Sequence, residues 1–268
     1  MEIYQHLAAV YDRGGWGEFS KRLFPYLQRV LRRFRLHPRR ILDLACGTGT
    51  MAIALAHDGY QVIAVDLSAA MLGEAERKAQ REDVEVLFLQ QDMRELSLPE
   101  PVDLVTCFFD SINYLLSYQD LVRTFQRVAR VLTSGGLFIF DMNTPAGLAS
   151  NWSYRKDGRD LGDVAIIGTN SYDPEKKLGT IQITVFKKVK QLCLYEKFTE
   201  VHTERAYTRR EVKAALDEAS LKLMAHYDCL TFQRPGRKTG RILYVATRKA
   251  TSCPPHANGR GLRRRKKG

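Results

Sequence analysis

The stretch RRILDLACGTGT, residues 39–50, decides the fold predicted for this chain. Its apolar run ILDL is typical of a short buried parallel strand. Gly47 and Gly49 follow, and they allow a sharp turn whose backbone lies open to a ligand. The residues MAIALA at 51–56 then return to helical spacing. A strand, a glycine turn and a helix in this order predict the first βα unit of a nucleotide-binding sheet.

Two cofactors compete for such a turn. Gly47, Gly49 and Ala52 match the spacing of the dinucleotide fingerprint, so the spacing alone is weak evidence. Asp43 separates the two readings, because a fixed carboxylate at the end of the strand repels a pyrophosphate and attracts a cation. S-adenosylmethionine carries a sulfonium and an ammonium and has no phosphate. Asp43 therefore favours this cofactor, and a glycine turn with only a structural role is the remaining alternative.

The chain here resembles the class I S-adenosylmethionine-dependent methyltransferases. Their first motif matches Asp43, Ala45, Gly47 and Gly49, although Ala45 stands where many members carry glycine, which tightens the loop. The resemblance covers about residues 1–145 well, and it implies S-adenosylmethionine as the cofactor. Beyond this region it is looser, and it points to bacterial small-molecule methyltransferases that act on glycine or on amino sugars.

A second predicted strand, QVIAV at 61–65, ends at Asp66. A carboxylate at this place accepts two hydrogen bonds from the cis diol of a ribose. Ser68 is a predicted N-cap of the following helix. The resemblance places Leu67 and Met71 around the adenine, and packing in the core is an equal alternative for both.

The third and fourth strands are predicted at 84–89 and 102–109. Asp92 follows the third strand at its carboxyl end, where open α/β sheets bind ligands, and it is expected to accept a hydrogen from the adenine amino group. The resemblance adds Met93 and Phe108 to the cofactor site. No other residues of these strands are assigned to the cofactor.

The acceptor is expected beside residues 110–114, DSINY, at the edge of the same crevice. Methyl transfer by in-line displacement depends chiefly on positioning and on the exclusion of solvent, because the sulfonium is already activated. If a base is needed, Asp110 is the first candidate by position, followed by Tyr11 and His202. The resemblance folds the N-terminal segment over the cofactor, so that Tyr11 also reaches the methionyl end. An aromatic ring packed under a helix is an equal alternative.

The pattern changes to alternation between residues 143 and 207. Strands are predicted at 164–172, at 180–185 and at 192–205, which indicates an inserted antiparallel sheet before the last helix. His202 and its neighbouring glutamates share one face of the third strand. A metal site is one interpretation of that face, and a solvated or hydrogen-bonded face is favoured. The sheet is expected to cover the acceptor, and a homodimer surface is the alternative.

The fold class predicted from these patterns is α/β, a doubly wound, mostly parallel seven-stranded sheet with helices on both faces and an inserted antiparallel sheet. Helices are predicted at 18–36, at 121–132 with an end at 134–136, and from a capping box at 208–211. The remaining strands are expected at 137–142, 221–229 and 242–247, the last two as an antiparallel end of the sheet.

These elements divide the chain into five expected regions. They are a cofactor-covering segment and helix at 1–36, the cofactor-binding core at 37–145, the inserted sheet as an acceptor lid at 146–207, the completion of the core sheet at 208–250, and a disordered basic tail at 251–268.

Composition limits the other function classes. The 268 residues include five cysteines without a C-x-x-C pair, which favours a reducing cytoplasm over a disulfide framework or a zinc site. No apolar run of about 18 residues or export signal is seen, so a membrane location is not expected. Half of the net charge of +12 lies in the last sixteen residues, so nucleic acid contacts through the tail are not favoured. An RNA methyltransferase is the alternative function, and an NAD-dependent enzyme is a remote one.

Overall fold

The computed structural model describes residues 3–153, 156–189 and 194–249. The tail predicted to be disordered, 251–268, lies outside these residues. Within the described ranges, no helix is both long enough and apolar enough to cross a membrane.

The main sheet has seven strands in the order β10-β11-β5-β4-β1-β2-β3. The strands β1 to β5 are parallel to one another, as the sequence predicts. β11 runs against them between β5 and β10, and β10 pairs with β11 in the antiparallel sense, which confirms the antiparallel end predicted for the sheet. The bounds are β1 Arg40–Leu44, β2 Gln61–Asp66, β3 Leu87–Gln90, β4 Val102–Cys107, β5 Leu132–Asn143, β10 Leu221–Asp228 and β11 Arg241–Arg248.

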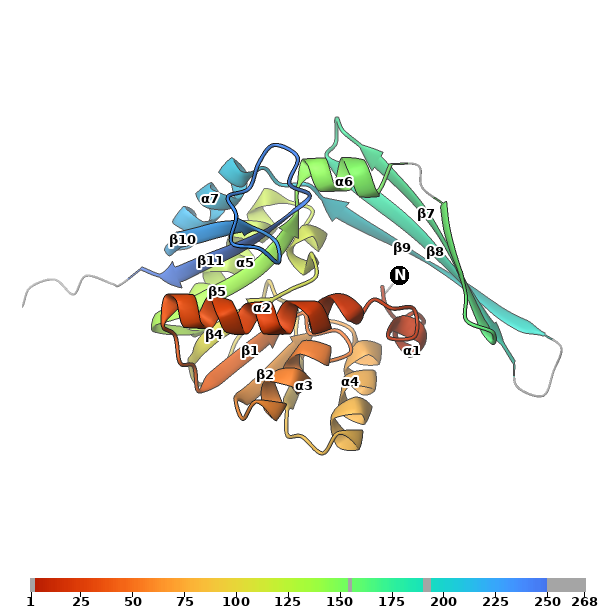
Figure 1. The fold of residues 1–268 in the computed structure, drawn as a ribbon, viewed down its shortest axis with the longest axis horizontal. Helices are drawn as coiled ribbons and strands as arrows, with labels where there is room; N and C mark the ends of the chain where they lie inside the picture. The colour runs from red at the N-terminus through yellow and green to blue at the C-terminus, as the bar shows by residue number, and fades with distance from the viewer. Residues whose placement is uncertain (1–2, 154–155, 190–193, 250–268) are drawn as a thin grey trace, which may run out of the picture.

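Helices cover both faces of this sheet, which confirms the doubly wound fold (Figure 1). The alternation of strand side chains explains the two layers: Ile41 of β1 packs under α2 and α3, whereas Leu42 and Leu44 pack toward α5 and α7. The helices are α1 Ala8–Tyr11, α2 Glu18–Phe34, α3 Thr50–His57, α4 Ala69–Arg81, α5 Tyr118–Val131, α6 Pro145–Asn151 and α7 Arg209–Glu218, with a 3₁₀ turn, η1, at Ser111–Tyr114.

The inserted sheet is antiparallel throughout and projects from the main body beside α1 (Figure 1). Its strands, in spatial order, are β6 Lys156–Asp160, β7 Val164–Asp173, β8 Leu178–Lys188 and β9 Tyr195–Arg205. One face is buried, because Val164 and Ile183 pack with Leu7 of the N-terminal segment in a third apolar cluster. The same alternation leaves Ile167 and Val201 about half exposed on the opposite face.

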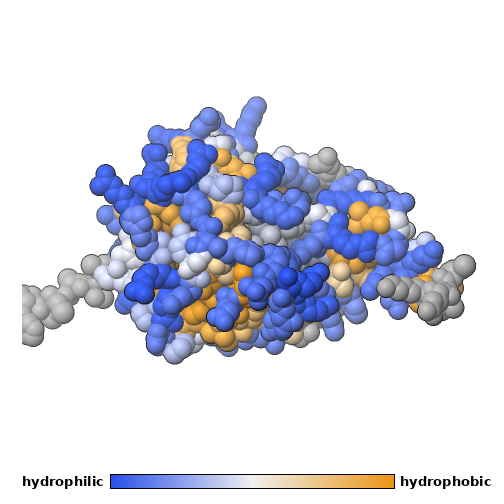
Figure 2. All heavy atoms as spheres, turned by 60° about the horizontal axis from the view of Figure 1, so that its bottom comes forward, coloured by the Kyte–Doolittle hydropathy of each residue, from blue (hydrophilic) through white to orange (hydrophobic). Residues whose placement is uncertain are grey.

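The surface is mainly hydrophilic in Figure 2, where separate apolar patches lie over the main body and over the projecting part. The large exposed apolar side chains come from several elements, and they include Leu67 and Leu87 as well as those of the inserted sheet. Scattered apolar residues of this kind are normal on a folded protein.

Three local predictions need correction. The glycine pair at 134–136 does not end a helix, because α5 ends at Val131 and β5 begins at Leu132. A Cβ on Gly136 would lie 2.9 Å from the carbonyl oxygen of Asp103, so the glycine there allows two strands to approach closely. The third strand begins at Leu87 rather than at residue 84, and the fourth ends at Cys107 rather than at residue 109.

Four elements were not predicted, namely α1, η1, α6 and β6. The helix α6 follows Thr144, whose hydroxyl accepts a hydrogen bond from the backbone N–H of Gly147, with Pro145 at the first helical position. These are ordinary start signals of a helix and were available in the sequence. The strand β6 is exposed along its whole length, so no alternation of apolar residues marks it.

Candidate active site

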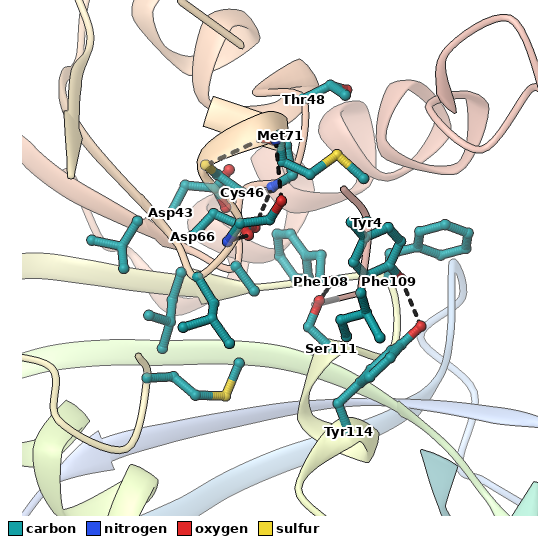
Figure 3. A pocket seen from close by; sticks show the side chains of 18 of the residues that line it. Tyr4, Asp43, Cys46, Thr48, Asp66, Met71, Phe108, Phe109, Ser111 and Tyr114 are labelled. Atoms are coloured by element: carbon teal, nitrogen blue, oxygen red, sulfur yellow. Dashed lines mark hydrogen bonds between the residues drawn. The ribbon is translucent and has the colours of Figure 1, made fainter. Parts of the chain in front are cut away.

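A cavity of about 610 Å³ lies where β1, β2 and β4 end (Figure 3). Asp43 and Asp66 line one part of it, and the side chains of Tyr4 and Tyr114 meet at another, with Phe108 between them. Open α/β sheets bind ligands at the carboxyl ends of their strands, and this cavity has that position.

Asp43 is buried at the end of β1 on the cavity wall. Its Oδ1 accepts a hydrogen bond of 2.7 Å from the hydroxyl of Thr106, while Oδ2 has no hydrogen-bond partner among the described residues. Burial raises the pKa of Asp43 to about 7, against the hydrogen bond from Thr106 and with support from the nearby charge of Asp66. A buried carboxylate oxygen without a partner suits a cationic ligand.

The turn after β1 contains three residues with left-handed backbone. Ala45 has φ 57°, Gly47 has φ 55° and Gly49 has φ 74°. The left-handed region is costly for alanine, which explains why glycine is common at the position of Ala45. A Cβ on Gly47 would meet nothing within 4 Å, so this position is open to the cavity that Gly47 lines.

Gly49 differs from Gly47, because it is not part of the cavity wall. A Cβ on Gly49 would lie 2.9 Å from the Cβ of Ala75 in α4. The structure thus gives Gly49 a packing role between the start of α3 and α4, although the sequence motif placed it among the cofactor residues.

Asp66 fixes the turn from the neighbouring strand. Its Oδ2 accepts a hydrogen bond of 2.8 Å from the N–H of Gly47, and its Oδ1 accepts one of 2.9 Å from the N–H of Ser68. Burial raises the pKa of Asp66, and these backbone hydrogen bonds oppose the rise. Each carboxylate oxygen has more than one lone pair, so Asp66 can also accept hydrogen bonds from a ligand in the cavity.

Four predicted residues line the cavity near Asp66, namely Leu67, Met71, Asp92 and Met93. The carboxylate of Asp92 is held on both oxygens by the guanidinium of Arg94, at 2.5–3.0 Å. This hydrogen bonding lowers the pKa of Asp92. Asp92 therefore lies where the sequence placed it, as a charged and already paired carboxylate.

The N-terminal segment lies against the glycine turn. The hydroxyl of Thr48 donates to Oδ1 of Asp12 at 2.8 Å, and the ammonium of Lys78 lies 2.5 Å from Oδ2 of Asp12. Lys78 also donates to the hydroxyls of Thr48 and Thr50. These contacts join the N-terminal segment, the turn and α4, and they bring Tyr11 to the cavity wall.

Two tyrosines that were not among the predicted site residues lie at the far end of the cavity. The hydroxyls of Tyr4 and Tyr114 are 2.6 Å apart, and both side chains line the cavity (Figure 3). Tyr114 lies within the stretch 110–114 that was expected beside the acceptor. A tyrosine in that stretch was the available signal, since a phenol is both a donor and an acceptor.

The three candidate bases differ in their position relative to the cavity. Tyr11 lines the cavity, whereas Asp110 and His202 do not. Asp110 is buried, and its Oδ2 accepts hydrogen bonds from Arg241 at 2.6 Å and from Asn143 at 2.5 Å. His202 lies behind Tyr114, with its Nδ1 3.2 Å from the tyrosine hydroxyl. Asp110 therefore belongs to an ion-paired network next to the cavity rather than to its wall.

The face of β9 that carries His202 is not solvated. His202, Glu200 and Glu204 are all buried, and hydrogen bonds hold them to other elements. In the described part of the chain, no three His, Cys, Asp or Glu side chains are grouped so that they could hold a metal ion.

Comparison with known proteins agrees with this geometry. Residues 41–136 match the family model described as "Methyltransferase domain". The YqeM protein of Bacillus subtilis (strain 168), which carries the name of a methyltransferase, is 31% identical over 257 residues, 93% of this chain and 98% of that protein. The dTDP-4-amino-2,3,4,6-tetradeoxy-D-glucose N,N-dimethyltransferase of Saccharopolyspora spinosa is 29% identical over 213 residues, 78% of each chain.

A solved structure of an S-adenosylmethionine-dependent methyltransferase from Clostridium acetobutylicum ATCC 824 is similar over nearly the whole fold. Its TM-score is 0.81 at 29% identity, and the match covers 93% of this chain and 100% of the other. The family settles the choice between the two cofactors that the glycine turn left open. The chain belongs to the S-adenosylmethionine-dependent methyltransferases.

Proposed function

We propose that this enzyme methylates a small-molecule acceptor, and that the acceptor atom is an amine nitrogen. The observation that carries the proposal is the continuity of one cavity, which has the carboxylates of Asp43 and Asp66 in one part and two hydroxyl-bearing aromatic rings in another. Relatives that methylate the amine of a nucleotide-linked sugar support the choice of an amine.

The residues of the first part fit S-adenosylmethionine. Asp43 lines the cavity with a carboxylate that suits an ammonium, and Gly47 leaves open space where a side chain would stand. We place the ribose hydroxyls on Asp66, whose carboxylate is fixed by two backbone N–H groups. Leu67 and Met71 then lie beside the adenine. When bound, the cofactor supplies a methyl group that is already activated on sulfur.

The second part would hold the acceptor. Tyr11 and Phe108 line the cavity, and Tyr4 and Tyr114 add two hydroxyls that can orient a polar molecule. The inserted sheet packs on the N-terminal segment that carries Tyr4 and Tyr11, so it supports this wall from behind. In this proposal the sheet acts as a lid that positions the acceptor and excludes water.

Incubation with methyl-labelled S-adenosylmethionine and a cell metabolite extract, followed by mass spectrometry, tests the proposal. We expect the label in a product that is smaller than a nucleic acid fragment. The Asp66→Ala variant should not form this product. Label that enters RNA, together with an RNA affinity that falls steeply with salt, would favour the alternative function instead. We also place the reaction in the cytoplasm, because the described cysteines Cys46, Cys107 and Cys229 are free thiols.

A further inference from the structure

Three polar side chains form a chain that leads away from the cavity, and the inner two are buried. The Tyr114 hydroxyl lies 3.2 Å from Nδ1 of His202, and Nε2 of His202 lies 3.3 Å from Oε2 of Glu200. Tyr114 belongs to η1 and lines the cavity, whereas His202 and Glu200 lie on the buried face of β9 and are 1% and 3% exposed. The order of these groups runs from a cavity hydroxyl to an imidazole and then to a carboxylate.

Glu200 is a charged group at the inner end of this chain. Its carboxylate accepts hydrogen bonds from the backbone N–H groups of Tyr4 at 2.6 Å, His6 at 2.9 Å and Leu7 at 3.0 Å. Burial works toward a higher pKa, but His202 and these three N–H groups hold the pKa of Glu200 below its ordinary value. A fixed negative charge therefore stands beside the imidazole.

His202 is arranged to receive a proton on one nitrogen and to be stabilised on the other. Nδ1 faces the hydroxyl of Tyr114, so a neutral imidazole that accepts from Tyr114 carries its hydrogen on Nε2, toward Glu200. Nε2 is buried and has no hydrogen bond of good geometry among the described residues, although Glu200 is within ion-pair distance. A second hydrogen on Nδ1 would create an imidazolium whose charge Glu200 offsets.

We propose that Tyr114, His202 and Glu200 form a proton relay that deprotonates the amine acceptor, which rests on the proposed function. In this step the N–H bond of the acceptor ammonium breaks and an O–H bond forms at Tyr114. The original O–H bond of Tyr114 breaks as its proton forms an N–H bond at Nδ1 of His202. The acceptor nitrogen keeps its electron pair for the methyl group, and the imidazolium returns the proton to water when the cavity opens.

The relay gives each residue a distinct role. Tyr114 is the catalytic residue, because its hydroxyl lies on the cavity wall. His202 and Glu200 are positioning residues that act through it. Tyr4 lies 2.6 Å from the same hydroxyl and can fix its orientation from the opposite side. The arrangement follows the general pattern in which a reacting group is paired with a base and the base is oriented by a third group.

The first test reads the hydrogen position on His202 and needs no acceptor. In protein labelled with ¹⁵N-histidine, with the resonance assigned through its loss in His202→Gln, we expect the neutral form to carry its hydrogen on Nε2. Tyr114→Phe should shift the Nδ1 resonance, and His226 serves as the internal control. A neutral His202 with its hydrogen on Nδ1 would overturn the relay, because Tyr114 could then not pass its proton to that nitrogen.

The second test uses a panel of amines, namely glycine, sarcosine and a dTDP-linked amino sugar, with methyl-labelled S-adenosylmethionine. Tyr114→Phe and His202→Gln should each lower kcat by about 10²–10⁴-fold, and the double variant should be about as slow as either single one. Affinity for S-adenosylmethionine should stay within about threefold, because the relay acts on the acceptor. Tyr118→Phe, whose hydroxyl bonds to Glu218 on the surface, is the matched control.

A solely structural role gives a different result. In that case the melting temperature and the cofactor affinity fall together, and the effects of Tyr114→Phe and His202→Gln add in the double variant. If the parent enzyme methylates none of these amines, the choice of an amine acceptor fails. The NMR measurement on His202 then still decides whether Tyr114 donates to Nδ1, as the relay requires.

Discussion

Arg241 on β11 donates a hydrogen bond of 2.6 Å to the carboxylate of Asp110, the residue that precedes η1. The same guanidinium donates to Asp141 at 2.5 Å. Asp141 in turn accepts hydrogen bonds from the N–H groups of Phe109 and Asp110, two residues with left-handed backbone. The ion pair therefore holds the strained turn that leads into η1.

Arg241→Met should destabilise the enzyme strongly, because it leaves the carboxylates of Asp110 and Asp141 buried without their cation. We expect a loss of about 3–5 kcal/mol in the free energy of unfolding, measured by urea denaturation. Arg237→Met, in the exposed loop that precedes β11, is the control. An equal stability of both variants would show that the network contributes little.

The raised pKa of Asp43 makes cofactor binding depend on pH. If Asp43 must be ionised to hold the ammonium, affinity should be about tenfold weaker at pH 6 than at pH 8, measured by calorimetry, because one pH unit below the pKa only a tenth of the sites are charged. Asp43→Asn should weaken binding and remove this dependence. An unchanged pH profile in the variant would take Asp43 out of the ammonium site.

In the protein without cofactor, ionisation of the Asp43 carboxyl should lower stability, whereas it favours cofactor binding. The pKa of Asp43 rises from 3.8 to about 7 on folding, so its contribution to stability is complete below the unfolded pKa and is lost as pH rises through about 7. Asp43→Asn should therefore raise the melting temperature relative to the parent more at pH 8 than at pH 5. A constant difference between the two proteins would contradict the buried carboxyl.

Asp66→Ala should weaken binding of S-adenosylmethionine by about 2–4 kcal/mol, the value of two hydrogen bonds to a charged group. The loss has a second source, since Gly47 and Ser68 would both lose the acceptor of their backbone N–H. Calorimetry measures the change, with Glu76→Ala on the exposed side of α4 as the control. Parent-like affinity would remove Asp66 from the site.

Two substitutions in the glycine turn should change the free energy of unfolding in opposite directions. Ala45→Gly relieves a left-handed alanine and should raise the free energy of unfolding by about 0.5–1 kcal/mol after the entropy of glycine is included. Gly49→Ala forces a Cβ against Ala75 at φ 74° and should cost about 1–3 kcal/mol. Gly73→Ala, where the new Cβ finds ordinary contact inside α4, is the control and should stabilise slightly.

The sequence predicts the parts of this fold that depend on local pattern. Apolar runs and alternation locate all seven strands of the main sheet and three of the four in the inserted sheet. The caps at Ser68 and Thr208 form as expected, because they involve only neighbouring residues. The cavity also lies beside Asp43 and Asp66, since the carboxyl ends of parallel strands share one edge.

The sequence does not predict contacts between distant segments. Asp110 and Arg241 are separated by 131 positions, and Tyr114 and His202 by 88, so only the packing of β11 and β9 against the core brings each pair together. For this reason the sequence indicates the stretch 110–114 but not the contact between Tyr114 and His202. The strand β6 was missed for a different reason, because its exposed residues carry no apolar signal.

The most direct test of the whole account is a crystal structure of the enzyme with S-adenosylhomocysteine. We predict that the ribose hydroxyls lie within hydrogen-bond distance of Asp66, that the amino group lies beside Asp43, and that the sulfur faces Tyr4 and Tyr114. A product bound with its ribose away from Asp66, or with its sulfur turned from the two tyrosines, would contradict the proposed site.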